Sequence, residues 1–425
     1  MDFSSFNFDS KISAGIRALG YSQPTPIQRQ SIAPILQGRD VLGLAQTGTG
    51  KTAAFALPIL QRLLAGPRGV ARALVLAPTR ELADQIRESF RGLGLETGLR
   101  SLTVYGGVGF SPQVAGLRKG VEIVVACPGR LLDHLEHGTI NVSRLEVLVI
   151  DEADRMFDMG FLPSVRKIIK RLPPRRQTLL FSATMPDDIR GLAHEILRDP
   201  VTAQADLGVP LTTVTHALYP VPEHLKSDLL SRLLKGTGEG SVLIFMRTKH
   251  RAKRLWQRLQ EQGLAATCLQ GNLSQNKRKA AMEGFRSGKF NILVATDIAS
   301  RGIDISQITH VINYDVPDTT EAYTHRIGRT GRAAKTGDAF TFVTREDEAM
   351  IRDIERALGS KLERRTAPGF DYAARKAVVS PAPKRGGHLV LSAPRSPSHP
   401  ARADDNGSGS RGHFRRRRFR PRRGR

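Results

Sequence analysis

Cysteine and long apolar runs are scarce in this chain of 425 residues. The chain contains two cysteines, Cys127 and Cys268, which cannot form the framework of a disulfide-stapled secreted protein. No apolar run approaches the ~18 residues that a membrane span needs. The N-terminus also lacks the basic start and apolar stretch of a signal peptide. We therefore expect a reduced, soluble, cytoplasmic protein.

Acidic residues are few relative to basic ones. The chain has 65 Lys and Arg against 40 Asp and Glu, which gives a net charge of +25. Residues 381–425 hold 13 basic and 2 acidic residues, so this segment alone carries +11. Such a field attracts polyanions, and nucleic acid is the commonest polyanion inside cells.

The order of the apolar segments predicts α/β architecture with two domains. Short runs that are apolar throughout suit strands buried on both faces of a parallel sheet, and helix-like segments such as residues 80–93 separate these runs. Glycine and proline interrupt the pattern near residues 206–211, and a second series begins after them. The expected strands are residues 41–45, 73–78, 121–126, 145–150 and 178–184 in the first series, and 242–246, 291–296, 310–315 and 339–344 in the second.

The first chemical motif, AQTGTGKT at residues 45–52, lies between an expected strand and a helix-like segment. It fits the phosphate-binding P-loop, with Ala45 in place of the usual first glycine. Gly48 and Gly50 let backbone N–H groups surround phosphate oxygens, while Lys51 reaches the β and γ phosphates and the Thr52 hydroxyl binds Mg²⁺. A simple glycine-rich turn would not need this strand–loop–helix context. The predicted nucleotide-binding positions of the loop are Ala45, Gln46, Thr47, Gly48, Thr49, Gly50, Lys51 and Thr52.

The second motif is DEAD, residues 151–154, at the end of an expected buried strand. Ligands bind at the carboxyl ends of strands in such sheets. We expect Asp151 to bind Mg²⁺ and Glu152 to act as the base that orients and deprotonates the attacking water. Four such residues alone would more often be a solvated helix start, but the upstream P-loop favours the catalytic interpretation.

The third motif, HRIGRTGR at residues 325–332, belongs to the second domain and offers Arg326, Arg329 and Arg332. Phosphoryl transfer needs positive charge near the developing γ-phosphate charge. Alone, the motif would be an ordinary basic surface patch. Together with the first-domain site, it predicts arginine fingers that engage when the domains close.

These motifs together resemble the DEAD-box ATP-dependent RNA helicases, and the resemblance covers about residues 3–369. RTKH at residues 247–250, QGNLSQ at 270–275 and the basic C-terminal extension are most similar to the bacterial RhlE branch. The motifs that occur in the order of the family are GYSQPTPIQ (20–28), AQTGTGKT, PTRELA (78–83), the glycine pair 106–107, CPGR (127–130), DEAD, SAT (182–184), ATDIASRGIDI (295–305) and HRIGRTGR.

The resemblance implies two tandem RecA-like doubly wound domains and a role for each matching residue. Gln28 is expected to read the adenine edge, and Tyr21 to stack on the base, although a core aromatic is the alternative for Tyr21. Asp304 is expected to contact the ribose. The residues expected to couple hydrolysis to domain closure are Asp154, Ser182 and Thr184, and the expected arginine fingers are Arg329 and Arg332. Expected contacts to the RNA sugar-phosphate backbone, which position a strand without reading its sequence, are Arg80, Gly107, Arg130, Thr296 and Arg301.

The resemblance also implies cofactors, partners and a domain plan. ATP and Mg²⁺ are the expected cofactors. Single-stranded and duplex RNA, bound largely independently of sequence, are the expected partners, together with ribonucleoprotein or RNA-processing factors. ATP and RNA should both favour the closed form and therefore bind cooperatively. The expected parts are an adenine-reading region (1–30), a first RecA-like domain (31–205), a linker (206–212), a second RecA-like domain (213–375) and a disordered Arg-rich tail (376–425).

Two residues depart from the family pattern, and two other functions compete with the helicase interpretation. Cys127 stands where threonine is usual, which puts one RNA contact in doubt, and Gln270 stands where histidine is common. A DNA-translocating motor of the same fold is one alternative, but such translocases lack an element like GYSQPTPIQ. An RNA-binding chaperone with a vestigial ATPase is the other. The intact set of Lys51, Glu152, Arg329 and Arg332 argues against it.

Overall fold

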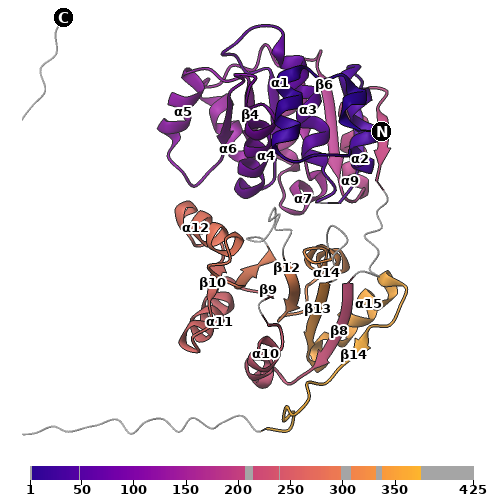
Figure 1. The fold of residues 1–425 in the computed structure, drawn as a ribbon, viewed down its shortest axis with the longest axis vertical. Helices are drawn as coiled ribbons and strands as arrows, with labels where there is room; N and C mark the ends of the chain where they lie inside the picture. Colours follow the sequence, from indigo (N-terminus) through magenta and orange to yellow (C-terminus); the bar gives the residue numbers. More distant parts are fainter. Residues whose placement is uncertain are drawn as a thin grey trace, which may run out of the picture. The chain divides into compact units, whose positions relative to one another are not determined.

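The computed structural model describes residues 2–46, 48–205, 214–238, 240–297, 308–331 and 337–374. Within these ranges the chain forms two parallel sheets of seven strands each, with helices between successive strands (Figure 1). The predicted α/β class, with two tandem doubly wound domains, is confirmed. The predicted linker and tail lie outside the described residues. None of the described helices is long and apolar enough to cross a membrane.

The first sheet has the strand order β3-β4-β2-β5-β6-β1-β7. Its strands are β1 (Val41–Leu44), β2 (Ala73–Leu76), β3 (Ser101–Val104), β4 (Ile123–Ala126), β5 (Val147–Ile150), β6 (Gln177–Ser182) and β7 (Val201–Gln204). The accompanying helices are η1 (Phe3–Phe6), α1 (Ser10–Ala18), α2 (Pro26–Leu36), α3 (Lys51–Leu64), α4 (Arg80–Leu93), α5 (Phe110–Arg118), α6 (Pro128–Glu136), α7 (Ala153–Asp158), α8 (Leu162–Ile169) and α9 (Asp187–Ile196).

The second sheet has the strand order β10-β11-β9-β12-β13-β8-β14. Its strands are β8 (Val214–Pro220), β9 (Ser241–Met246), β10 (Ala266–Leu269), β11 (Ile292–Thr296), β12 (Ile308–Asn313), β13 (Gly337–Val343) and β14 (Glu363–Arg364). The accompanying helices are η3 (Glu223–Leu225), α10 (Lys226–Leu234), α11 (Lys249–Glu261), α12 (Gln275–Arg286), α14 (Thr320–Ile327), η4 (Arg345–Asp347) and α15 (Glu348–Leu358).

The strands of each sheet are buried on both faces. In β2, Ala73 and Val75 pack into one hydrophobic cluster with residues of α1 to α4, while Leu74 and Leu76 pack into another with residues of α6, α8 and α9. The second sheet follows the same rule, because one face packs against α10 and α11 and the other against α12, α14 and α15. Side chains alternate along a strand, so two buried faces require strands that are apolar throughout.

The parallel arrangement determines where the motifs lie. Neighbouring strands within each sheet run parallel, so their carboxyl ends meet at one edge. The P-loop comes after β1, PTRELA after β2, CPGR after β4 and DEAD after β5, and SAT ends β6. Segments far apart in the sequence are therefore gathered at a single edge of the first sheet.

Candidate functional site

The P-loop connects β1 to α3 and holds its lysine inside the loop. Gly48 and Gly50 have φ values of 90° and 91°, a region that L-residues with side chains rarely adopt. Lys51 begins α3, is only 6% exposed, and donates a hydrogen bond from Nζ to the Ala45 carbonyl at 2.9 Å. Thr49 Oγ1 donates to the Gln46 carbonyl at 2.8 Å. Thr47 lies outside the described residues.

Gln28 links helix α2 to the P-loop. Its Oε1 accepts a hydrogen bond from the Thr25 backbone at 2.9 Å, and its Nε2 donates to the Gly50 carbonyl at 3.0 Å. A Cβ at position 50 would lie 2.5 Å from Gln28 Nε2, so a side chain there would break this contact. Both functions of the Gln28 amide are thus engaged by backbone groups, and adenine reading by Gln28 stays a prediction.

Tyr21, the other residue predicted to contact the base, is exposed. The side chain is 40% exposed, and its ring stacks on that of Phe3 with 6.2 Å between centroids. The exposure contradicts the alternative of a core aromatic. Base stacking by Tyr21 stays a prediction.

The first two acidic residues of DEAD lie beside the P-loop lysine. Asp151 follows β5 directly, is 2% exposed and has its Oδ1 4.0 Å from Lys51 Nζ. Burial raises the pKa of Asp151 to about 6, with Lys51 opposing this rise and Glu152 adding to it. Glu152 has φ 54° and ψ 53°, a left-handed conformation that is costly for a residue with a side chain and is typical of functional sites.

Arg155 is a functional candidate that the sequence reasoning missed. Its Nη1 lies 2.7 Å from Glu152 Oε2, and both side chains are buried. The available signal was the arginine placed three residues after Glu152, a spacing at which side chains meet on one face of a helix. The ion pair orients the carboxylate that is predicted to act as the base.

Asp154 connects the DEAD segment to the SAT motif at the end of β6. Its Oδ2 accepts hydrogen bonds from the Ala183 and Thr184 backbone N–H groups at 3.1 and 2.9 Å and from Thr184 Oγ1 at 3.1 Å. Ser182 Oγ accepts from the Asp154 backbone at 3.2 Å and donates to the Thr184 carbonyl at 2.7 Å. The three predicted coupling residues therefore form one hydrogen-bond network, in which Asp154 and Ser182 are buried and Thr184 is exposed.

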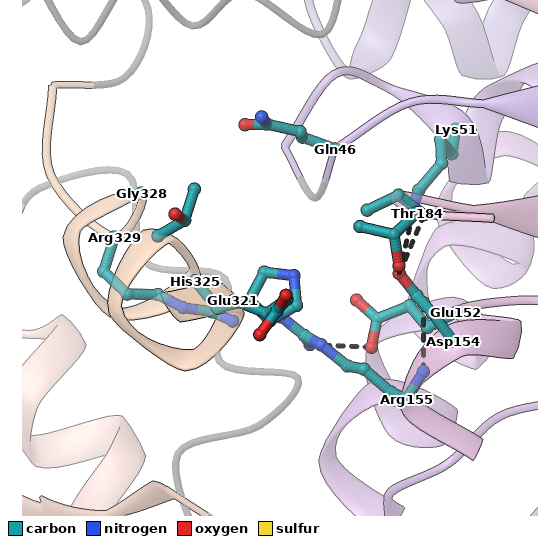
Figure 2. Close-up of a pocket in the computed structure, with 12 residues that line it drawn as sticks. Gln46, Lys51, Glu152, Asp154, Arg155, Thr184, Glu321, His325, Gly328 and Arg329 are labelled. Atoms are coloured by element: carbon teal, nitrogen blue, oxygen red, sulfur yellow. Dashed lines mark hydrogen bonds and ion pairs between the residues drawn. The ribbon is translucent and has the colours of Figure 1, made fainter. Parts of the chain in front are cut away.

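A cavity of about 150 Å³ is lined by residues of both domains (Figure 2). The side chains from the first domain include Lys51, Glu152 and Asp154, and those from the second include His325 and Arg329. Figure 2 shows Arg155 reaching from the Glu152 side toward α14. The complete lining is Gln46, Lys51, Glu152, Asp154, Arg155, Ala183, Thr184, Glu321, Thr324, His325, Gly328 and Arg329.

The arginines of HRIGRTGR have different environments. Arg329 is 4% exposed and lines the cavity. Arg326 instead forms a bidentate ion pair with Asp297, with both N–O distances 2.6 Å, and donates to the Asp315 carbonyl at 2.7 Å. Arg332 lies outside the described residues. His325, which the sequence reasoning did not single out, has its pKa lowered to about 4 by burial and by the neighbouring Arg155.

Two predicted RNA contacts of the first domain meet at the glycine pair. A Cβ at Gly107 would lie 2.0 Å from Arg80 Nη1, and the φ of Gly107 is +79°, so only glycine fits there. Arg130 Nη1 donates to the Val108 carbonyl at 3.1 Å and lies over the Phe110 ring. Arg80 and Arg130 thus approach the same loop.

In the second domain, Thr296 ends β11 and is buried. Arg301 and Asp304 lie outside the described residues, so their predicted roles have no structural counterpart. The sequence reasoning also missed two contacts that join the domains. Arg278 Nε lies 2.7 Å from Glu81 Oε1, and Arg80 Nη1 lies 3.4 Å from Gln275 Oε1.

The two departures from the family pattern are both largely buried. Cys127 occupies the N-cap of α6 without a side-chain cap hydrogen bond, and burial raises the pKa of its thiol to about 12. Gln270 Oε1 accepts from the Asn272 backbone at 2.7 Å, and the Gln270 carbonyl accepts from Arg278 at 3.3 Å. Gln270 therefore shapes the loop after β10.

Comparison with known proteins decides the family. The model "DEAD/DEAH box helicase" matches residues 25–192, and "Helicase conserved C-terminal domain" matches residues 225–334. ATP-dependent RNA helicase CshA of Listeria monocytogenes is 42% identical over 372 residues, which cover 87% of this chain and 71% of that protein. The chain belongs to the DEAD-box helicase family.

Another relative and a solved structure also support the assignment of this chain to the DEAD-box helicase family. ATP-dependent RNA helicase DeaD of Buchnera aphidicola is 41% identical over 377 residues, which cover 88% of this chain and 62% of that protein. Among solved structures, S. cerevisiae Dbp5 bound to RNA and ADP BeF3 matches with a TM-score of 0.78 at 29% identity, covering 86% of this chain and 96% of that one. The tandem RecA-like fold implied by the sequence is thereby confirmed.

Proposed function

We propose that this helicase hydrolyses ATP to separate short RNA duplexes locally and to remodel RNA or ribonucleoprotein structure. The observation that carries the proposal is the cavity in which Lys51 and Glu152 of the first domain face the same space as Arg329 of the second. A nucleotide bound by the first domain would receive the second-domain arginine only in this arrangement. Closure and hydrolysis would then be linked.

ATP is the proposed substrate nucleotide and Mg²⁺ the proposed metal. The donor set fits Mg²⁺, because Asp151 and Thr52 offer hard oxygen ligands beside a phosphate loop. Mg²⁺ commonly binds through one or two carboxylates together with phosphate oxygens of the substrate. When bound, Mg²⁺ neutralises charge on the phosphates.

The chain's own residues would then divide the remaining work. Lys51, released from the Ala45 carbonyl, would bind phosphate oxygens. Glu152 would accept the proton of the attacking water, with Arg155 orienting its carboxylate. Arg329 and Arg332 would stabilise the charge that develops in the transition state, and Asp304 would contact the ribose.

The proposed coupling residues, and those proposed RNA-binding residues that the structure describes, lie near the carboxyl ends of the strands in the two sheets. The Asp154–Ser182–Thr184 network joins the catalytic segment to the end of β6, so a shift in one would be felt by the other. Arg80, Gly107 and Arg130 would bind one stretch of RNA backbone. Thr296 and Arg301 of the second domain would bind the next stretch, without reading sequence.

Three finer assignments are also proposed. The domain boundaries are those expected from the sequence, with the first RecA-like domain at residues 31–205 and the second at 213–375. The RhlE branch is supported by RTKH, QGNLSQ and the basic extension, although the relatives compared with this chain carry the names CshA and DeaD. A cytoplasmic location is supported by the two cysteines, both of which are free thiols, as expected in a reducing compartment.

ATP turnover measured with and without RNA tests the proposal. We expect RNA to stimulate turnover, and a short duplex with a single-stranded overhang to be separated only when ATP is present. Turnover that is unaffected by RNA would contradict the proposed function. Equal use of GTP and ATP would contradict the adenine-reading role of Gln28.

A further inference from the structure

Helix α11 of the second domain is strongly basic, as is α12, which has four Lys or Arg residues and one acidic residue. Over thirteen residues, KHRAKRLWQRLQE, α11 contains five Lys or Arg residues and a single acidic residue, Glu261, at its end. By contrast, α4 and α15 each mix acidic and basic residues along their length. The charge of α11 is therefore not the usual pattern of a solvated helix.

This charge distribution works against the stability of the helix. The first turn of α11 has no acidic residue but contains Lys249 and Arg251, although the positive end of the helix dipole favours anions there. Lys249 and Lys253 also share one face at a spacing of four residues, as do Arg254 and Arg258, and like charges at this spacing repel. Basic residues of α11 that lack an acidic partner in the described part of the protein would therefore be stabilised by a bound anion.

The basic residues of α11 fall into two groups. Arg258 lies 2.7 Å from Asp228, and Arg251 lies 2.9 Å from Asp315, so both have acidic partners. Lys253 and Arg254 are exposed and have no acidic partner among the described residues. Lys249 is exposed and donates from Nζ to the neutral Asn272 Oδ1 at 3.2 Å. We call Lys249, Lys253 and Arg254 the α11 stripe.

The stripe begins at the edge where the predicted RNA contacts of this domain lie. Lys249 and Thr296 line the same cavity of about 970 Å³, together with Gly271. From Lys249 the stripe continues along the helix by one turn, or roughly 6 Å, to Lys253. The stripe therefore extends along α11 from the cavity that Thr296 lines.

We propose that the α11 stripe binds the phosphate backbone of RNA that flanks the strand held in the helicase core. The inference rests on the proposed function and extends it from Lys249, the third residue of RTKH, to Lys253 and Arg254, which lie outside the named motifs. The aromatic residue of the helix, Trp256, is partly buried and donates its Nε1–H to the Ala266 carbonyl at 3.0 Å, so it offers no stacking platform. The stripe therefore binds charge and not base identity.

The experiment uses the full chain with two RNAs, one a minimal single strand and the other a duplex with a single-stranded overhang. The double variants Lys253→Glu/Arg254→Glu and Lys253→Ala/Arg254→Ala are compared with a matched control, Lys235→Glu/Arg352→Glu. Lys235 and Arg352 are exposed in the same domain, at the end of α10 and on α15. The readouts are the RNA concentration for half-maximal ATPase stimulation and the dependence of binding on salt.

We expect both stripe variants to need more of the overhang duplex, with the glutamates having the larger effect. The slope of log affinity against log salt should become shallower by about 1 to 2, as for the loss of one or two phosphate contacts. The control should leave both quantities unchanged. Stripe variants that behave like the control would overturn the inference, as would a loss that does not depend on salt, which would indicate a protein-binding or structural role. If RNA does not stimulate ATP turnover by the wild type, that result contradicts the proposed function itself, on which the inference about the α11 stripe depends.

Discussion

The two sheets of this helicase share one strand order but differ in the segments that come after their equivalent strands. Counted from its own first strand, each sheet runs third-fourth-second-fifth-sixth-first-seventh. After β1 the chain forms the glycine loop, and Lys51 begins α3. After β8 it forms the short helix η3, and Lys226 begins α10. The two lysines thus occupy equivalent positions in the two domains.

Each lysine also faces an equivalent aspartate. Lys51 lies 4.0 Å from Asp151, which follows β5, and Lys226 lies 3.8 Å from Asp315, which follows β12. In the second domain, however, Glu223 lies 2.9 Å from Lys226 and places a carboxylate where the first domain leaves space for phosphate. Arg251 adds a second cation 2.9 Å from Asp315.

The difference shows how one architecture serves two purposes. In the second domain the charges around Lys226 neutralise each other, so the position equivalent to the P-loop is complete without a phosphate. In the first domain Lys51 is held by a carbonyl and one distant carboxylate, and burial raises the pKa of Asp151 to about 6. The carboxyl edge of the first sheet therefore has a place for an anion beside Lys51 and for a cation beside Asp151. The second domain contributes Arg329, which follows α14, to the same cavity.

The largest expected effect concerns that contribution from the second domain. Arg329→Ala should lower RNA-stimulated ATP turnover by ~10³–10⁵, the range found for arginine fingers, because Arg329 lines the shared cavity. Steady-state turnover at saturating RNA measures this effect. The neighbouring Arg326→Ala should instead destabilise the domain, since it leaves Asp297 without its bidentate partner. A loss below tenfold for Arg329→Ala would place the residue outside the site.

The second largest expected effect is the loss of turnover when Glu152, the proposed base of the first domain, is replaced. Glu152→Gln should reduce turnover by roughly 10²–10⁴, the usual contribution of general acid–base catalysis, because the amide keeps the shape but cannot take a proton. ATP and RNA should still bind together in this variant, as fluorescence anisotropy of labelled RNA can measure. Wild-type turnover would refute the role of Glu152.

The central strands could be predicted from the sequence, but the strands at the sheet edges could not. The segments 73–78 and 145–150 are apolar throughout because β2 and β5 are buried on both faces. The edge strands β3 and β7 are only partly covered, so their sequences do not show a continuous apolar run. The edge strands β10 and β14 of the second sheet were also not predicted, nor was β8, which lies inside that sheet between β13 and β14, whereas each expected strand overlaps an observed one.

The site residues could also be predicted only in part. Its motifs could be found because their chemistry fixes residue types at short spacings, as in the P-loop. The partners of those motifs depend on tertiary structure. Arg278 meets Glu81 from 197 positions away, and Lys226 meets Asp315 only because β8 and β12 belong to one sheet. No local pattern contains such pairs.

A smaller effect tests whether the ion pairs of Lys226 stabilise the second domain in the absence of a ligand. Lys226→Met should lower the free energy of unfolding by about 3 kcal/mol, the low end of the range for breaking a buried ion pair, because Arg251 still faces Asp315. Chemical denaturation measures the loss. The control Arg258→Met removes an exposed pair with Asp228 and should cost less than about 1 kcal/mol. Equal losses in the two variants would contradict the comparison of the two edges.

The smallest expected effect comes from the two cysteines, one in each domain, which should respond oppositely to the same substitution. Cys127 occupies the N-cap of α6 without a side-chain cap bond, so Cys127→Thr should raise the free energy of unfolding by about 0.5–1 kcal/mol through a new cap. Cys268 is buried in β10 among apolar residues. Cys268→Thr should therefore lower the free energy of unfolding by about 1–3 kcal/mol, because the hydroxyl must be buried. Denaturant titration of both variants measures the two signs. Destabilisation by Cys127→Thr would mean that the thiol packs at the N-cap in a way that a hydroxyl cannot replace.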